Sequence, residues 1–130
     1  MKYLLLLFFA LPLFSACQEK DRQAPEVDPE ILTGMWVHSY EEDTSGHKVY
    51  RPEDYPFPPA RGREGFEIRE NGMFFHRSIA PADGYLIHEG RWELVEGNIL
   101  RVRFEAEKLR DFSLEIIRLV EDMLVVKEQG

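Results

Sequence analysis

Short alternations of apolar and polar residues dominate the middle of the chain. Bulky apolar residues recur at every second position, and Gly, Asn, Asp or Pro interrupt them, in the segments 64–70, 73–80, 85–95 and 99–105. A period of two residues is typical of a β-strand with one buried face, and no stretch after Cys17 keeps a helical period for more than two turns. We therefore predict a meander of four antiparallel strands here.

The residues between these segments predict how the strands pair. Asn71-Gly72 suits a two-residue type I′ turn, because both central positions of that turn need a positive φ. A second two-residue loop at 82–83 and a three-residue loop at 96–98 then place one apolar set on a common face. The same register sets Glu93 opposite Arg101 on the outer face. The residues predicted to point inward are Phe66, Ile68, Met73, Phe75, Arg77, Ile79, Leu86, His88, Trp92, Leu94, Leu100, Val102 and Phe104.

Four further strands complete the predicted sheet. They cover 33–41 and 47–51 before the meander and 112–120 and 123–127 after it. A sheet with one apolar face must bury that face, and near-neighbour connections favour closure of the sheet on itself. The sequence thus predicts one all-β domain over residues 31–130, a small antiparallel up-and-down β-barrel of about eight strands.

The N-terminus has a different composition. One positive charge, an apolar run and small residues precede Cys17. The apolar run is shorter than the roughly 20 residues that a helix needs to cross a bilayer, so residues 1–16 are predicted to be a signal peptide. Phe-Ser-Ala-Cys at 14–17 resembles the lipobox of bacterial lipoproteins, which implies cleavage after residue 16 and lipidation of Cys17.

Residues 17–30 are predicted to be the lipidated cysteine and a flexible tether. Six charges and two prolines accompany one aliphatic side chain larger than alanine, Val27, in residues 18–29. Such a segment buries too little surface to offset its ordering entropy. We therefore expect a lipid-anchored protein of the bacterial cell envelope, on the outer membrane, with a membrane as its partner. Whether the domain lies on the periplasmic or the surface face stays open.

Composition excludes several functions. The chain holds 24 acidic against 16 basic residues, a net charge of -8, which disfavours nucleic acid as a partner. Cys17 is the sole cysteine, so lipidation leaves no thiol nucleophile. No nucleophile elbow, zinc-binding helix motif or phosphate-binding loop occurs in the sequence. We expect no enzymatic activity, no cofactor and no metal; Glu67, His76 and Glu89 align on the predicted outer face, where surface charges are far commoner than metal ligands.

A family resemblance supports the barrel. Gly-Met-Trp at 34–36 resembles the Gly-x-Trp signature of the lipocalin and wider calycin superfamily. Together with the meander, Gly-Arg-Trp at 90–92 and the leader, it makes the chain similar to small bacterial lipocalin-like lipoproteins. The resemblance covers 31–127 and implies that Trp36 closes one barrel end, with Arg118 as the candidate for the arginine that stacks on it. It implies a fold rather than a ligand.

Four inward residues form the candidate ligand site: Arg77, His88, Phe66 and Trp92. An eight-stranded barrel can hold one small ligand, and an inward cation among aromatic rings suits an anionic head group. The alternative is a polar pair that satisfies the core internally, as an ion pair or through water.

The proline-rich segment 51–63 is a second candidate. Its four prolines exclude an inner strand. Tyr55, Phe57, Arg61 and Arg63 are the residues that a partner would contact if the segment is a lid or a docking loop. In the alternative, Tyr55 and Phe57 cover one end of the core.

Two functions follow from these candidates. The leading hypothesis is a membrane-anchored envelope lipoprotein that binds a small hydrophobic or anionic amphipathic ligand inside the barrel. The other is a non-enzymatic envelope module that docks a protein or polysaccharide through 51–63. A cavity of several hundred Å³ favours the first, and a solid interior with an exposed Tyr55/Phe57 patch favours the second.

Overall fold

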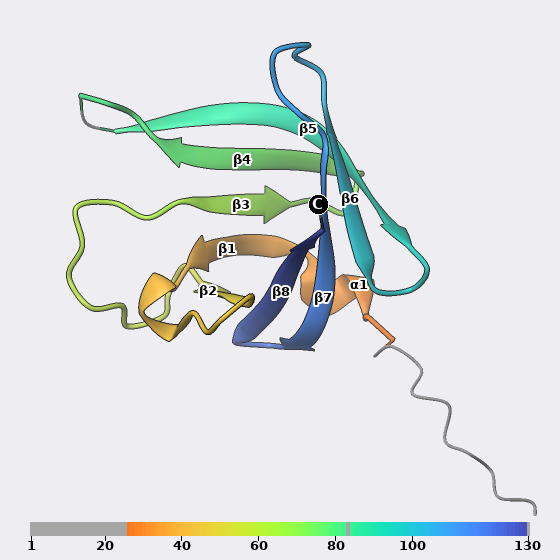
Figure 1. Ribbon diagram of the computed structural model, residues 1–130, viewed down its shortest axis with the longest axis horizontal. Coiled ribbons are helices and arrows are strands. Elements are labelled where there is room, and N and C mark those ends of the chain that lie inside the picture. Colours follow the sequence, from red (N-terminus) through yellow and green to blue (C-terminus); the bar gives the residue numbers. More distant parts are fainter. Residues whose placement is uncertain (1–25, 83, 130) are drawn as a thin grey trace, which may run out of the picture.

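A computed structural model of the chain describes residues 26–82 and 84–129 (Figure 1). The predicted signal peptide, the lipidation site Cys17 and the tether up to residue 25 lie outside the described residues. Within the described ranges, no helix has the length and apolar character that crossing a bilayer requires.

Eight antiparallel strands form a closed barrel, which confirms the predicted fold class. All eight predicted segments overlap the observed strands. The strands are β1 (Gly34–His38), β2 (Lys48–Pro52), β3 (Gly65–Ile68), β4 (Met73–Ile79), β5 (Tyr85–Val95), β6 (Ile99–Phe104), β7 (Phe112–Val120) and β8 (Met123–Gln129). Two short helical elements accompany them, α1 (Pro29–Leu32) and the 3-10 turn η1 (Tyr40–Glu42).

One connection departs from neighbour order. The strands follow each other around the barrel as β1-β2-β8-β7-β6-β5-β4-β3, so β3 to β8 form a meander. β1 pairs with β2 on one side and with β3 on the other. The connection 53–64, which contains most of the proline-rich segment, therefore carries the chain from one side of β1 to the other. It is the long loop between β2 and β3 in Figure 1.

The loop between β3 and β4 is one residue longer than predicted. The Arg69 N–H donates to the Met73 carbonyl at 3.0 Å, and the Gly72 N–H donates to the Arg69 carbonyl at 3.2 Å. Gly72 takes the left-handed conformation, with a φ of 85°. This is the geometry of a three-residue hairpin loop with glycine in its last position, rather than of a two-residue type I′ turn.

The longer loop reverses the faces of β4. Ile68 pairs with Phe74 instead of Phe75. A slip of one residue moves every side chain of a strand to the opposite face. Phe74 is fully buried, and His76 lines the barrel interior. The predicted inward orientation of Met73, Phe75, Arg77 and Ile79 is therefore wrong.

The turn between β4 and β5 is also one residue longer than predicted, and it restores the faces of β5. Ile79 pairs with Tyr85 instead of Leu86. His88 and Trp92 consequently keep the inner face that the sequence predicted. The pairs with β6 are also as predicted: Gly90 with Phe104, Trp92 with Val102, Leu94 with Leu100, and Glu93 with Arg101 on the outer face.

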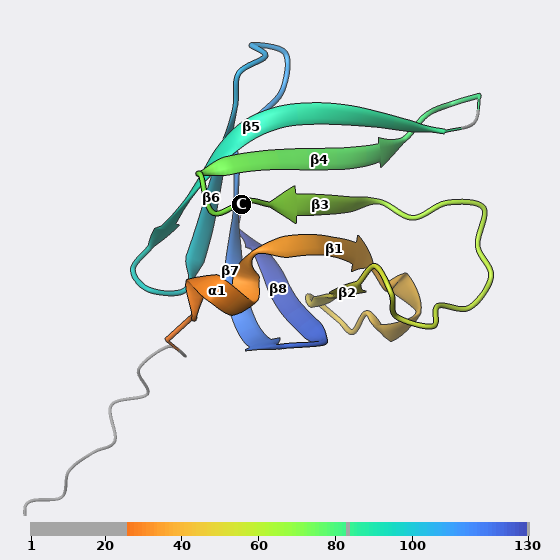
Figure 2. The same cartoon turned by 180° about the vertical axis from the view of Figure 1, so that it is seen from behind.

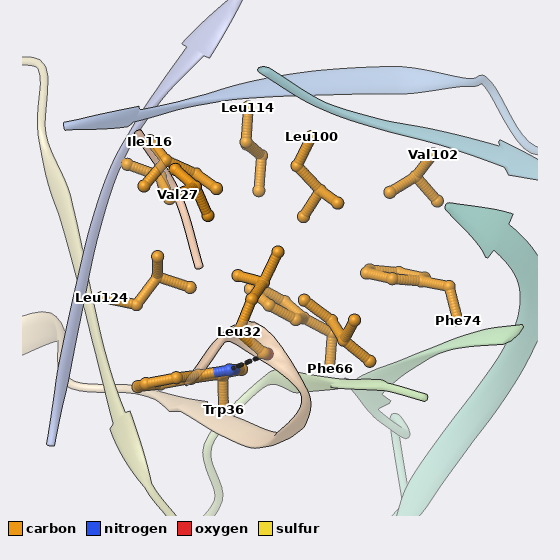
Figure 3. Close-up of a cluster of buried hydrophobic side chains, with 12 residues drawn as sticks. Val27, Leu32, Trp36, Phe66, Phe74, Leu100, Val102, Leu114, Ile116 and Leu124 are labelled. Atoms are coloured by element: carbon orange, nitrogen blue, oxygen red, sulfur yellow. Dashed lines mark hydrogen bonds between the residues drawn. The ribbon is translucent and has the colours of Figure 1, made fainter. Parts of the chain in front are cut away.

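The core fills the part of the barrel that α1 closes (Figure 3). It contains two residues of the N-terminal segment, Val27 and Leu32, and ten from the strands: Trp36, Phe66, Ile68, Phe74, Leu100, Val102, Leu114, Ile116, Leu124 and Val126. The Asp28 carboxylate accepts the Glu30 N–H at 2.9 Å and caps α1. The packed domain therefore begins before residue 31, inside the segment predicted to be a tether.

Trp36 closes this end with a different partner from the one that the resemblance implied. Its indole Nε1 donates to the Leu32 carbonyl at 2.8 Å. Arg118 follows a β-bulge in β7, pairs with Val125 and is exposed, so it does not stack on Trp36. The segment that precedes the barrel in the chain thus supplies the partner of Trp36 at this end.

We expect Trp36→Phe to lower the free energy of unfolding by about 1–2 kcal/mol, because it leaves the buried Leu32 carbonyl without its donor. Trp92→Phe is the matched control, since Trp92 Nε1 donates to the Arg69 carbonyl at 2.7 Å at a more exposed position. Urea unfolding followed by circular dichroism measures both. Equal losses of stability in the two variants would contradict a larger contribution from the buried Trp36–Leu32 hydrogen bond.

Candidate functional site

A cavity of about 420 Å³ lies where the packed core ends. Strands from both sides of the barrel and the connection between β6 and β7 line it. Its apolar and aromatic lining residues are Tyr50, Phe66, Phe104, Leu109, Phe112 and Leu114, and its polar ones are Lys48, Glu64, His76, His88, Arg110, Ser113, Glu128 and Gln129. The volume lies within the range of small-molecule sites.

Aromatic rings form a connected wall on the apolar side of the cavity. The centroids of Tyr50 and Phe66 are 4.7 Å apart, and those of Phe104 and Phe112 are 5.7 Å apart. Phe74, buried behind them, stacks on Phe66 at 5.4 Å. Contacts of this kind hold rings in fixed orientations, so the wall is formed before any ligand arrives.

Two histidines form the polar side. His76 and His88 lie directly opposite each other on β4 and β5, and their rings stack with centroids 6.1 Å apart. Burial lowers the pKa of His76 below its usual range. The imidazole of His76 is therefore neutral at pH 7 and offers one hydrogen-bond donor and one acceptor.

Tyr50 adds a third polar group. Burial raises the pKa of its phenol well above the usual range, and the nearby carboxylate of Glu128 acts in the same direction. The hydroxyl thus stays protonated. The His38 ring stacks on Tyr50 at 5.1 Å and is itself held by Asp43 at 2.8 Å.

Charged groups at the cavity occur in opposite signs. Lys48 pairs with Glu128 across β2 and β8, at 2.5 Å. Glu64 and Arg110 also line the cavity and are exposed. His76 and Tyr50, by contrast, contribute uncharged polar groups. The arrangement suits an apolar ligand body with an uncharged hydrogen-bonding group.

The structure brings together two of the four predicted ligand-site residues. Phe66 and His88 line the cavity. Arg77 lies on the outer face, where its guanidinium stacks on the Tyr85 ring at 4.4 Å. Trp92 is partly buried against the core and does not line the cavity. The sequence prediction missed His76, which a three-residue loop at Glu70-Asn71-Gly72 would have turned inward.

The same correction separates the three residues that were predicted to align outside. Glu67 and Glu89 both pair with Phe75, so they stay on the outer face. His76 points into the barrel. Within residues 26–82 and 84–129, no group of three or more potential metal-ligating side chains is present.

The proline-rich segment is fastened to the barrel by Arg63, which is 7% exposed. Arg63 makes two hydrogen bonds to the Glu41 carboxylate, at 2.8 and 2.5 Å, and donates to the carbonyls of His38 and Pro58. Its guanidinium also lies over the rings of Tyr40 and Phe57. This arginine, predicted to contact a partner, is engaged within the chain.

The other residues of the segment are more accessible. Tyr55 and Phe57 are half-buried and contact each other edge to face at 5.0 Å, and Arg51 lies over Tyr55 at 4.6 Å. They lie outside the core and so do not cover its end. Arg61 is exposed.

Comparison with known proteins gives no relative: the chain matches no family model, no curated protein and no solved structure.

Proposed function

We propose that the barrel binds a small amphipathic ligand in the 420 Å³ cavity. The observation that supports this proposal is the lining itself: a preformed aromatic wall faces a pair of stacked histidines. Ligand sites in proteins combine a mostly apolar surface with a few polar groups that fix orientation. The wall would hold the ligand body, and His76, His88 and Tyr50 would bind its polar end.

The proposed ligand lacks the anionic head group that the sequence suggested as one of two options. That expectation depended on an inward Arg77, which lies outside. The cavity instead offers the neutral His76 imidazole, the His88 ring and the Tyr50 phenol. We therefore propose a hydrophobic body with an uncharged donor or acceptor, of about the size of one fused ring system.

The setting of this binding activity is also a proposal. The leader and Cys17 support a lipid anchor in the bacterial envelope, and the Gly-x-Trp strand supports a lipocalin-like origin for the domain. We propose a non-enzymatic binding role. Docking of a protein or polysaccharide through 51–63 has less support, because Arg51 and Arg63 hold Tyr55 and Phe57 against the chain.

A fluorescent apolar probe tests the cavity. We expect N-phenyl-1-naphthylamine to brighten on binding the purified protein, and His88→Trp to weaken its affinity at least about tenfold by filling the cavity, a difference of about 1.4 kcal/mol. His47→Trp is the matched control, because His47 lies in the 44–47 turn and does not line the cavity. Circular dichroism verifies that both variants fold. Equal affinities in both variants would overturn the proposal.

A further inference from the structure

β5 extends beyond the strand that pairs with one of its edges. It pairs with β4 from Tyr85 to Arg91, but with β6 only from Gly90 to Val95. The last bond on the β6 side is a long one of 3.5 Å, from the Glu105 N–H to the Glu89 carbonyl. In Figures 1 and 2, the start of β5 is accordingly the outermost strand of the projecting β4–β5 hairpin.

The backbone groups of this edge have no partner in the described part of the chain. In an antiparallel strand, alternate residues direct their N–H and C=O groups to the same side. Tyr85 and Ile87 thus point the same way as Glu89, away from β4. Among residues 26–82 and 84–129, no hydrogen bond reaches the N–H or C=O groups of Tyr85 or Ile87 from that side.

Nothing in the sequence of this edge protects it from another strand. Proteins usually block a free edge with lysine, proline or a β-bulge. The edge consists of Tyr85, Leu86, Ile87 and His88 instead, with exposed fractions of 45%, 48% and 59% for the first three. It is therefore both apolar and competent to form a β-ladder.

The edge also borders the cavity. His88 of β5 lines the cavity, and so do Leu109 and Arg110 from the connection between β6 and β7. A strand added along Tyr85–His88 would alternate its side chains, and those on the Leu86 and His88 face would be directed toward the aromatic wall. The unpaired backbone groups of Tyr85 and Ile87 suit one extended chain, which can satisfy them as an added strand. The net charge of -8 also disfavours self-association.

We propose that the Tyr85–His88 edge binds an extended segment of another protein as an added β-strand, with one apolar or aromatic side chain placed in the cavity. Backbone hydrogen bonds would supply affinity, and the cavity would select the side chain, as in other cases of strand addition. The backbone pairing is independent of the proposed small-ligand binding, whereas the side-chain placement rests on the same cavity.

Amide hydrogen exchange with a synthetic peptide tests this proposal. The probe is an acetylated, amidated hexapeptide of alternating threonine and valine with one central phenylalanine. We expect a saturating peptide to slow exchange of the Tyr85 and Ile87 amides at least about tenfold, since a ladder bond protects its N–H. A peptide N-methylated at the ladder positions should give no protection.

Paired variants locate the contact. Ile87→Lys should weaken peptide binding at least about tenfold, because it places a charge on the edge. Ile79→Lys is the control: Ile79 lies on β4 of the same hairpin and is 49% exposed. If Ile87→Lys fails to fold, the N-methylated peptide with the wild-type protein decides the question.

Each remaining outcome overturns the edge proposal or supports it. Peptide binding without protection of the Tyr85 and Ile87 amides overturns it. Protection of these amides by rising protein concentration alone also overturns it, because that result would indicate a second copy of the chain as the partner. Binding of N-phenyl-1-naphthylamine without peptide protection overturns the edge proposal and leaves the small-ligand proposal standing. Peptide protection without probe binding supports the edge and contradicts the small-ligand proposal.

Discussion

Replacing Phe74 with alanine is expected to lower the free energy of unfolding by about 3–5 kcal/mol, the range for a fully buried phenylalanine. Phe74 has no exposed surface. Its ring contacts Phe66, Phe112 and Phe104 at centroid distances of 5.4, 5.8 and 6.3 Å. Removal would open a void between the core and the ligand cavity. Urea unfolding monitored by circular dichroism measures the loss.

The neighbouring phenylalanine supplies the control. Phe75 lies on the outer face, partly exposed beneath the Arg69 guanidinium at 4.3 Å. We expect Phe75→Ala to cost about 1 kcal/mol or less, as for a surface substitution. The pair of variants also tests the strand register, because the two-residue turn would bury Phe75 and expose Phe74. A larger loss for Phe75→Ala would contradict the observed pairing of β3 and β4.

The inner face of β4, unlike that of its neighbours, is not determined by the alternation of apolar and polar residues. In β5 and β6, apolar residues such as Trp92, Leu94 and Val102 alternate with charged ones, so the inner face is determined locally. β4 carries large apolar residues on both faces, with Phe74 and Phe75 adjacent. The length of the preceding turn therefore determines which face of β4 points inward. Asn71-Gly72 fits both a two-residue and a three-residue loop.

One residue of loop length therefore decided the candidate site. It replaced Arg77 with His76 as the inward partner of His88 and removed the cation expected to bind an anionic head group. The error did not spread to β5, because the next turn was longer by one residue as well. Strand count and barrel closure were insensitive to both slips, since they depend on which segments pair rather than on register.

The packing of Val27 and Leu32 at the other end of the barrel was not predicted, for a different reason. The segment around Val27 is polar on average, and its composition predicts no packing. A single buried valine and the capping pair Asp28-Pro29 suffice to anchor it, with Leu32 completing the contact. The average composition of the 12 residues 18–29 does not reveal a helix as short as the four residues of α1.

Arg63→Ala is expected to lower the free energy of unfolding by about 2–4 kcal/mol. Removing one partner of a buried ion pair typically costs 3–5 kcal/mol, and partial exposure of Glu41 reduces this. The Glu41 side chain is 32% exposed and would regain water, whereas the carbonyls of His38 and Pro58 would lose a donor. Arg61→Ala, at an exposed position two residues away, should change the stability by about 0.5 kcal/mol or less. Thermal and urea unfolding at pH 7 measure both variants.

The same variants should differ in acid. Hydrogen bonds from Arg63 lower the pKa of Glu41 from 4.5 to about 2. A carboxyl whose folded pKa lies below its unfolded value stabilises the fold fully above the unfolded pKa, and this contribution disappears as the pH falls through the folded pKa. The wild type and Arg61→Ala should therefore lose stability between pH 4.5 and 2 more steeply than Arg63→Ala. Identical slopes in all three proteins would show that the Glu41 carboxylate does not depend on Arg63.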